Sequence, residues 1–439
     1  MPARSFLLEE CANVKRVLEE TLRFEYGVGG SKDFYEECST RLAFITSEIE
    51  AADEHDLNSL AINHSLLLEL SKLISRIERS SLGQYSWPFV DELKEIASAI
   101  CAEETLNNSD VVPMVHVLSE GGLTAYAINP EQQRPSAGKR RILTIIFPRT
   151  LKHAVLLHSI LGHEIGHAIW RSSKHQATLN QALLDAFSAS AGHFSAPTAT
   201  VSWLYSNSAP VEVRTRLATL QAQGLAPAQF FQWASWDAWK EEILCDLIGI
   251  LTFGPSFIAA ECHLLYSIDL LGINIGQAHP PVACRVNLFL TAAKILGYCN
   301  TVYRNKDVQN AFNSFWGELE SYKKADPWFD VFTEAEITTA LTEIGRLLNS
   351  HPPAAFQMPD LHLFEHLYLQ LKQGIPPVGF KLDREKKPTT STVDFRHILY
   401  AGWLAAKSDA SISFHEINRL CEHAIMQQAA IKIYKSNHT

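Results

Sequence analysis

Two histidines four positions apart, with a glutamate after the first, form the part of this chain best suited to chemistry. His163, Glu164 and His167 stand in the segment LKHAVLLHSILGHEIGHAIWRS, residues 151–172. On a helix, residues i and i+4 share one face about 6 Å apart along the axis, so both imidazoles can bind one Zn²⁺. Glu164 would then project beside the open metal position and take a proton from the water that the metal activates. The pattern indicates a zinc hydrolase that needs a third ligand from elsewhere in the chain.

A downstream acidic helix supplies the candidate third ligand. The segment WDAWKEEILCDLIG, residues 236–249, places Glu242 and Asp246 four apart on one face of a strongly apolar helix. Burying two carboxylates on such a face is unfavourable unless they are paired or bind a metal. We therefore assign Glu242 as the third ligand and Asp246 as the acceptor that orients a metal-binding histidine. Glu241 is the alternative to Glu242, and its simpler interpretation is an exposed acid beside Lys240.

Two other histidine patterns compete with this assignment. In some zinc peptidases a third histidine follows H-E-x-x-H at a fixed spacing, which corresponds to Ser173 here. His175 lies two residues later, and we expect it at the surface beside Lys174. His362, Glu365 and His366 match the inverted zinc motif, H-x-x-E-H. No strand is predicted before them and no matching acid pair follows on an apolar helix, so we expect a solvated helix face. Cys245, between the two acids of the downstream helix, is expected to face the core.

A third motif follows in the same order along the chain. His279 begins the sequence HPPVACR, which ends at Arg285. Together, HEIGH, EILCD and HPPVACR resemble the gluzincin zinc peptidases, such as thermolysin, and in particular the group of CAAX prenyl proteases and heat-shock membrane peptidases. The resemblance covers about residues 163–285 and implies zinc as cofactor, a peptide or protein as substrate, and contact of His279 and Arg285 with substrate or the oxyanion. A tetrahedral intermediate needs such donors. The simpler interpretation is that His279 caps a helix and Arg285 is a surface cation.

Helical spacing of apolar residues governs most of the rest of the chain. Residues 1–105 and 301–439 are predicted to be α-helical regions, the second interrupted at 375–394 by a Pro/Thr-rich linker or arm. An extended arm could lie across a cleft, although a plain linker is the simpler interpretation. Residues 106–300 are expected to form a zincin-like metallopeptidase core. The predicted fold class is therefore mostly α with a small β-sheet (α+β).

The expected sheet lies just before the metal-binding motif. Residues 111–119 and 123–129 flank two glycines and predict a β-hairpin, and residues 141–147 predict a third strand. The metal-binding helix is expected to begin near Thr150. An edge strand of such a sheet can pair with an extended peptide while the helix supplies the metal ligands.

Composition excludes several classes of protein. The net charge is −10 and no long basic block occurs, which argues against nucleic-acid binding. The most apolar run, residues 243–260, is interrupted by Asp246, two glycines and Pro255, so we expect buried helices and no membrane span. Eight cysteines without a C-x-x-C pair and an N-terminus without a secretory signal favour a cytoplasmic location.

These observations lead to one function and one alternative. The expected function is a soluble zinc metalloendopeptidase that hydrolyses peptide bonds with a metal-activated water and Glu164 as general base. The alternative is a helical interaction or signalling protein whose zincin core is structural or inactive. In either case, the large helical regions on both sides of the core could bind a protein partner. The presence of Glu164 favours the enzyme over the structural or inactive alternative.

Overall fold

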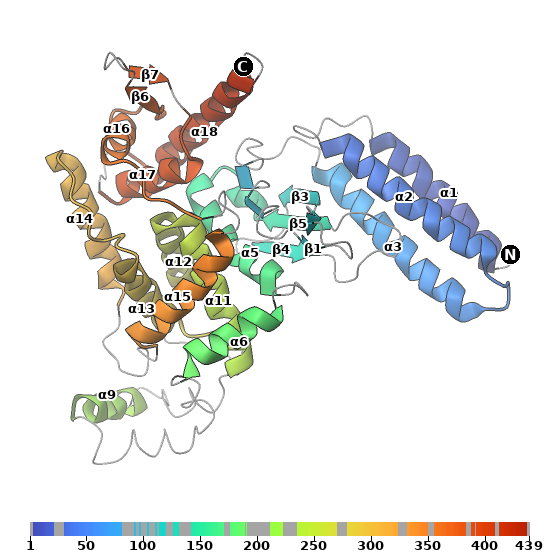
Figure 1. The fold of residues 1–439 in the computed structure, drawn as a ribbon, viewed down its shortest axis with the longest axis horizontal. Helices are drawn as coiled ribbons and strands as arrows, with labels where there is room; N and C mark the ends of the chain where they lie inside the picture. The colour runs from blue at the N-terminus through green and yellow to red at the C-terminus, as the bar shows by residue number, and fades with distance from the viewer. Residues whose placement is uncertain are drawn as a thin grey trace. The chain divides into compact units, whose positions relative to one another are not determined.

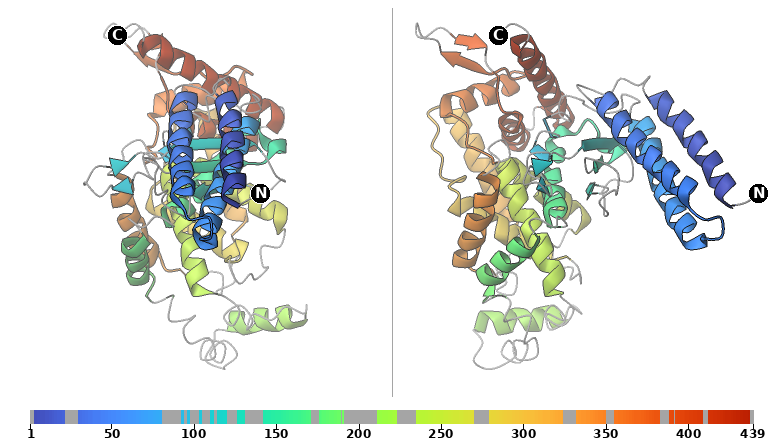
Figure 2. Two further views of the ribbon diagram at one scale, coloured as in Figure 1. Left: turned by 90° about the vertical axis from the view of Figure 1, so that its right-hand side faces the viewer. Right: turned by 45° about the vertical axis from the view of Figure 1, so that its right-hand side comes forward.

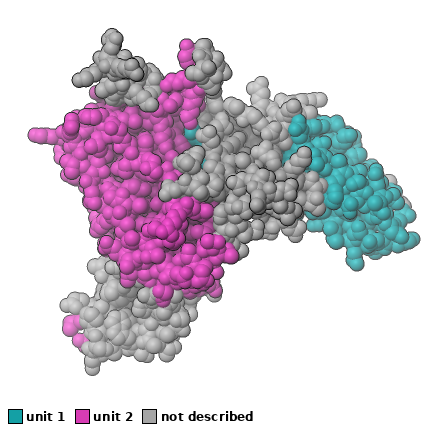
Figure 3. Space-filling view, in the orientation of Figure 1, with its two compact units in different colours: residues 1–152 teal, residues 153–439 magenta. Residues whose placement is uncertain are grey.

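The chain is mostly helical, as predicted, and divides into two compact units, Met1–Lys152 and His153–Thr439 (Figure 3). The structure is a computed structural model. It describes residues 3–21, 30–80, 92–93, 96–97, 103–104, 110–111, 114–119, 126–130, 142–170, 176–188, 190, 211–222, 235–269, 279–323, 332–349, 355–382, 388–390, 392–408 and 412–436. The division at Lys152 groups the predicted sheet with the N-terminal helices, and groups residues 153–300 with the C-terminal helices.

Three long helices form the start of the first unit: α1 (Ala3–Thr21), α2 (Gly30–Ala51) and α3 (Leu57–Ser80). Figures 1 and 2 show them packed side by side. Apolar residues at helical spacing face one another in a shared core, whose most buried members are Leu18, Phe34, Cys38, Ile49 and Ile74. Burial of this stripe, rather than the propensity of any one residue, stabilises the three helices.

The sheet of this unit has the strand order β3-β5-β4, formed by β3 (Met114–Ser119), β5 (Ile142–Phe147) and β4 (Ala127–Pro130). β3 pairs with β5 in parallel, and β4 pairs with β5 antiparallel. The predicted hairpin of residues 111–119 with 123–129 is therefore wrong, because neither strand pairs with the other. The most apolar strand, β5, lies between them, where both of its edges are hydrogen-bonded. A separate pair joins β1 (Glu103–Glu104) to β2 (Asp110–Val111).

The approach to the metal-binding motif differs from the prediction of one helix that begins near Thr150. Two short 3-10 helices, η1 (Arg149–Leu151) and η2 (Val155–Ile160), precede α5 (Leu161–Trp170). Tertiary hydrogen bonds hold η2: the Leu156 N–H donates to Asn418, and the Leu156 carbonyl accepts from the Trp403 indole. Partners from the C-terminal helices thus override the helical periodicity of this segment.

The second unit is built around one buried helix, α11 (Trp236–Phe253), which packs most extensively on α5. Their crossing requires glycine, because a Cβ on Gly166 would lie 2.5 Å from Cys245 Cα and one on Gly162 would lie 2.9 Å from Gly249 Cα. The two backbones approach closely enough for side chains of both helices to share one site. The other helices of the unit are α6 (Gln176–Ala186), α9 (Val211–Ala222), α12 (Pro255–Ile268), α13 (Val282–Ile295), α14 (Lys306–Ser321), α15 (Glu334–Asn349), α16 (Leu361–Lys372), α17 (Phe395–Ser408) and α18 (Phe414–Ser436).

The segment predicted as a linker or arm, residues 375–394, contains two short antiparallel strands, β6 (Phe380–Leu382) and β7 (Pro388–Thr390). It is fastened to α16 through Val378 N–H to Gln370, and to α18 through Val393 N–H to Gln428. Figure 1 shows β6 and β7 beside the C-terminal helices and away from α5. The described part of the segment therefore packs as a structural element of the C-terminal helices.

Among the helices that the structure describes, none is both long enough and apolar enough to cross a membrane.

Candidate metal centre

The imidazoles of His163 and His167 both turn their Nε2 atoms toward Glu242. The His163 Nε2 atom lies 3.3 Å from Glu242 Oε2, and the His167 Nε2 atom lies 3.6 Å from Glu242 Oε1. The two rings are 4.9 Å apart and nearly perpendicular, at 79°. The close crossing of α5 and α11 thus brings the Nε2 atoms of the two imidazoles next to the two oxygens of one carboxylate.

The other nitrogen of each imidazole is held by a carboxylate of α11. His163 Nδ1 lies 2.8 Å from Asp246 Oδ1, and His167 Nδ1 lies 2.8 Å from Glu241 Oε1. Each carboxylate accepts a hydrogen bond from Nδ1–H, so the lone pair of the neutral imidazole lies on Nε2. Asp246 stands where the sequence analysis placed an acceptor. Glu241 is neither a replacement for Glu242 nor an exposed acid beside Lys240.

The role of Glu241 was not predicted, because an acceptor was expected for only one of the two histidines. The spacing of the four residues on their helices could have indicated it. His167 follows His163 by one turn of α5, and Glu241 precedes Asp246 by somewhat more than one turn of α11. When two such helices pack antiparallel, each histidine of one helix can contact its own carboxylate on the other.

Glu242 is a buried carboxylate between the two imidazoles. Its Oε2 atom makes no hydrogen bond to the described residues, although buried carboxylates normally have partners. Burial raises the pKa of Glu242, but the adjacent His163 imidazole outweighs this effect and lowers the pKa to about 2. Burial lowers the pKa of His163, but Asp246 and Glu242 together raise it to about 10. The carboxylate therefore stays ionised and favours a cation at this point, and a metal that binds Nε2 must displace any proton there.

Cys245 offers a second way to complete a metal site. Its sulfur and one nitrogen from each of His163 and His167 lie within 4.8 Å of one another, so these three buried or half-buried residues could hold a metal ion. The expectation that Cys245 faces the core is thus incomplete, because the close crossing at Gly166 brings it near both imidazoles. Burial keeps the pKa of the thiol well above its usual value. The Nε2 atoms, which the Nδ1 hydrogen bonds leave available, also lie close to Glu242.

A further group of possible metal ligands, His163, Asp246 and Glu261, is already organised by a cation. The Arg285 Nη2 atom lies 2.5 Å from Asp246 Oδ1 and 2.8 Å from Glu261 Oε1, and its Nε lies 2.8 Å from Asp246 Oδ2. The guanidinium holds the pKa of Asp246 below its usual value, against the opposing effect of burial. This group is therefore a buried ion-pair cluster in which arginine supplies the positive charge.

The position of Arg285 excludes the simpler interpretation of a surface cation. Arg285 is only 5% exposed and its Nη2 atom lies 3.4 Å from His163 Nδ1, which is the side of the ring opposite Nε2. Its contact with an oxyanion stays a prediction. The motif HPPVACR predicts that Arg285 lies on a helix after His279. It does not predict which nitrogen of the His163 imidazole Arg285 approaches.

His279 and Glu164 are the more exposed polar residues beside the centre. The His279 side chain is 66% exposed, and its Nε2 atom lies 3.5 Å from Glu242 Oε1. It does not cap α13, whose N-cap residue, Pro281, has no side-chain hydrogen bond. Glu164 is half-buried in the first turn of α5, directly after His163. Both residues are therefore accessible from solvent and close to the ligand set.

The competing histidine patterns do not form a comparable site. His175 lies outside the described residues. In the inverted motif, Glu365 accepts hydrogen bonds from the N–H groups of Arg304 and Asn305, at 2.7 and 2.9 Å. Glu365 thus fixes the loop before α14 and is not the solvated acid that we expected.

Comparisons with models of protein families, with curated proteins and with solved structures find no match to this chain.

Replacing Arg285 by Met should destabilise the fold and not merely slow a reaction. The substitution leaves Asp246 and Glu261 buried without a cation, and loss of one partner from a buried ion pair typically costs about 3–5 kcal/mol. The free energy of unfolding from urea titration measures the effect. Arg346→Ala is the matched control, since Arg346 is 70% exposed in its pair with Glu343, and it should cost less than about 1 kcal/mol. Equal stability of the two variants would contradict the structural role of Arg285.

Proposed function

We propose that this chain is a zinc metallopeptidase of the gluzincin type. The observation that carries the proposal is the convergence of His163 Nε2, His167 Nε2 and Glu242, with both Nδ1 atoms held by carboxylates. Two imidazoles and one carboxylate form the donor set of catalytic zinc sites, which keep a fourth position open. The carboxylates behind the histidines fix their orientation and raise their basicity toward a metal.

The residues around this donor set have distinct roles in peptide hydrolysis. Zn²⁺ held there supplies Lewis-acid chemistry, which lowers the pKa of a water molecule and polarises the scissile carbonyl. Glu164 accepts the proton of the attacking water and later donates it to the leaving amine. His279, exposed beside Glu242, donates an N–H to the oxyanion. Asp246 and Glu241 hold the two imidazoles, and Arg285 holds Asp246.

The order of the three motifs supports the same proposal. HEIGH, EILCD and HPPVACR contribute residues to one centre, and their resemblance to the group of CAAX prenyl proteases and heat-shock membrane peptidases extends to this order. A soluble, cytoplasmic peptidase acting on a peptide or protein substrate is the form of the proposal that fits the composition. The first unit, with its own helical core, is available for a protein partner.

A structural zinc site is the second candidate, and Cys245 is the observation that favours it. If the thiol joined His163, His167 and Glu242, the metal would have four protein ligands and no open position, as structural zinc sites do. Co²⁺ substitution separates the candidates. A catalytic site without sulfur should lack the intense near-ultraviolet absorption of a cobalt–thiolate bond, and the spectrum should not change in Cys245→Ser.

The direct test combines metal content with hydrolysis. The purified protein should contain about one Zn²⁺ per chain and cleave an unstructured peptide mixture. Removal of the metal by a chelator should abolish cleavage, and one equivalent of Zn²⁺ should restore it, because a single three-ligand site carries the reaction. Stoichiometric zinc without cleavage of any peptide, together with a cobalt–thiolate band, would favour the structural candidate.

His279→Ala should lower kcat by roughly 10²–10³-fold, as the loss of one oxyanion donor does in other hydrolases. The zinc content should stay the same, because the side chain is exposed and lies outside the ligand set. His153→Ala is the matched control: this histidine is 57% exposed, and it pairs with Glu422 on α18. A fall in zinc content instead of kcat would remove His279 from the reaction.

A further inference from the structure

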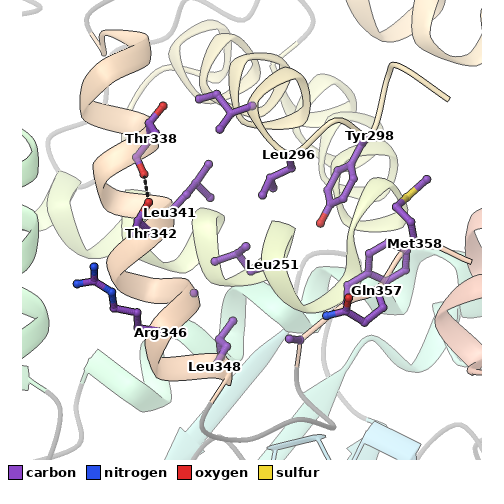
Figure 4. Close-up of a pocket in the computed structure, with 14 residues that line it drawn as sticks. Leu251, Leu296, Tyr298, Thr338, Leu341, Thr342, Arg346, Leu348, Gln357 and Met358 are labelled. Atoms are coloured by element: carbon purple, nitrogen blue, oxygen red, sulfur yellow. Dashed lines mark hydrogen bonds between the residues drawn. The ribbon is translucent and has the colours of Figure 1, made fainter.

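A cavity of about 570 Å³ lies in the second unit between α11, α13, α15 and residues 355–358 (Figure 4). Its size is within the range of about 300–1,000 Å³ that small-molecule sites occupy. It shares α11 with the candidate metal centre but includes none of that centre's residues. It therefore needs an explanation of its own.

The apolar part of the cavity wall is about as large as its polar part. Leu251 of α11, Leu296 after α13, and Leu341 and Leu348 of α15 face its interior (Figure 4). Among the described residues of the lining, none is a carboxylate, and the charged one, Arg346, is largely exposed and paired with Glu343 at 2.6 Å. A wall of this kind, with apolar and polar parts but without a free charge, favours an uncharged ligand.

Tyr298 provides the polar group that distinguishes this cavity from a packing defect. The side chain is only 5% exposed, and its hydroxyl makes no hydrogen bond within the described part of the chain. In Figure 4 the hydroxyl points into the space beside Leu251 and Leu296. The hydroxyl of a buried side chain normally has a hydrogen-bond partner in a native structure. The Tyr298 hydroxyl faces the cavity, so a molecule bound in the cavity can supply this partner.

The other hydroxyls of the lining do not have this property. Thr338 donates to the carbonyl of Glu334 at 2.7 Å, and Thr342 donates to the carbonyl of Thr338 at 2.8 Å. Burial raises the pKa of Tyr298, so its hydroxyl keeps its proton and acts as a donor. The group that it lacks is therefore a hydrogen-bond acceptor.

We propose that this cavity is a binding site for a neutral small molecule that has an apolar body and a hydrogen-bond acceptor such as a carbonyl oxygen. The acceptor binds the Tyr298 hydroxyl, and the apolar body of the ligand packs against the leucines of α11 and α15. Gln357, which lies next to Tyr298 in Figure 4, borders the same polar end of the cavity. The site is independent of the metal.

The neutral fluorescent ketone Prodan tests the proposal, because its emission shifts to the blue when it leaves water. It should bind the full-length protein at a single saturable site. Tyr298→Phe removes only the hydroxyl and should weaken binding by roughly threefold to tenfold, the value of one net hydrogen bond. Thr342→Trp, at an exposed position of the lining, and Leu251→Trp should each fill the cavity and remove saturable binding.

Leu361→Trp on α16 is the matched control, since Leu361 is 40% exposed and lies outside the cavity. It should bind Prodan as the wild type does. If Leu251→Trp does not fold, Thr342→Trp still decides the result, because its side chain starts at the surface. Absence of saturable binding, equal affinity in wild type and Tyr298→Phe, or binding that survives Thr342→Trp overturns the proposal.

Discussion

Glu164→Gln should keep its zinc and its fold but lose peptide hydrolysis by roughly 10²–10⁴-fold, the usual contribution of a general base. The amide has the shape of the carboxylate but cannot accept the proton of the attacking water. Glu164 directly follows His163 on α5, so the substitution leaves every ligand in place. Single-turnover kinetics on a peptide substrate at saturating zinc measure the chemical step.

The matched control for Glu164→Gln is the same substitution at Glu241. Glu241 contacts Nδ1 of His167 and not the open side of the centre, so at saturating zinc Glu241→Gln should keep most of the activity. The two variants remove one negative charge each from the same centre. If they lose activity equally, the loss reflects the charge of the site, and Glu164 is not the base.

The sequence was sufficient to predict the elements and residues that depend on local spacing. The spacing of apolar residues predicted a mostly helical chain, because an amphipathic stripe repeats within each helix. His163 and His167 lie on one face of α5, and Glu242 lies on a buried helix that faces them. Each of these predictions needed only the period of one helix and the unfavourable burial of carboxylates.

The incorrect predictions concern features that depend on tertiary contacts between segments distant in the sequence. The strands β3 and β4 pair with β5 and not with each other, because the choice among strand partners depends on which strand is most buried. Similarly, η2 replaces a continuous helix because Asn418 and Trp403 bind the backbone of Leu156. Arg285 is buried against Asp246 and is not a surface cation, which depends on how α13 packs on α11. None of these contacts follows from the spacing of residues within a single helix or strand, so the sequence pattern could not predict them.

The charges behind the metal centre form a connected set, which explains why so many ionisable groups are buried together. Asp246 accepts from His163 and from Arg285, and Arg285 also binds Glu261. Burial raises the pKa of Glu261, and the charge of Arg285 only partly opposes this effect. Helices α5, α11, α12 and α13 are joined by this cluster, so the orientation of His163 depends on all four.

Glu242→Ala should weaken zinc binding by roughly 10²–10³-fold. Structural zinc sites with four ligands bind with about 10–16 kcal/mol, or roughly 3–4 kcal/mol for each ligand, and about 1.4 kcal/mol corresponds to tenfold. Glu241→Ala should cost less, about 10–100-fold, because it removes a carboxylate that orients a ligand rather than the ligand itself. Glu241→Gln retains an acceptor for His167 Nδ1 and should have the smallest effect of the three. Competition with a chromogenic chelator at fixed pH measures all three affinities.

Two control variants test whether the order of zinc affinities reflects metal ligation by Glu242. Asp237→Ala, on the same helix but with a side chain that is 90% exposed, should leave zinc affinity unchanged. Cys245→Ser should also leave it nearly unchanged if Glu242 is the third ligand. A large loss of zinc in Cys245→Ser with little change in Glu242→Ala would instead make the thiol the ligand, and the site would lose the donor set on which the peptidase proposal rests. The order Glu242→Ala, Glu241→Ala, Glu241→Gln would show that the carboxylate that binds the metal and the carboxylate that orients His167 are neighbours on α11.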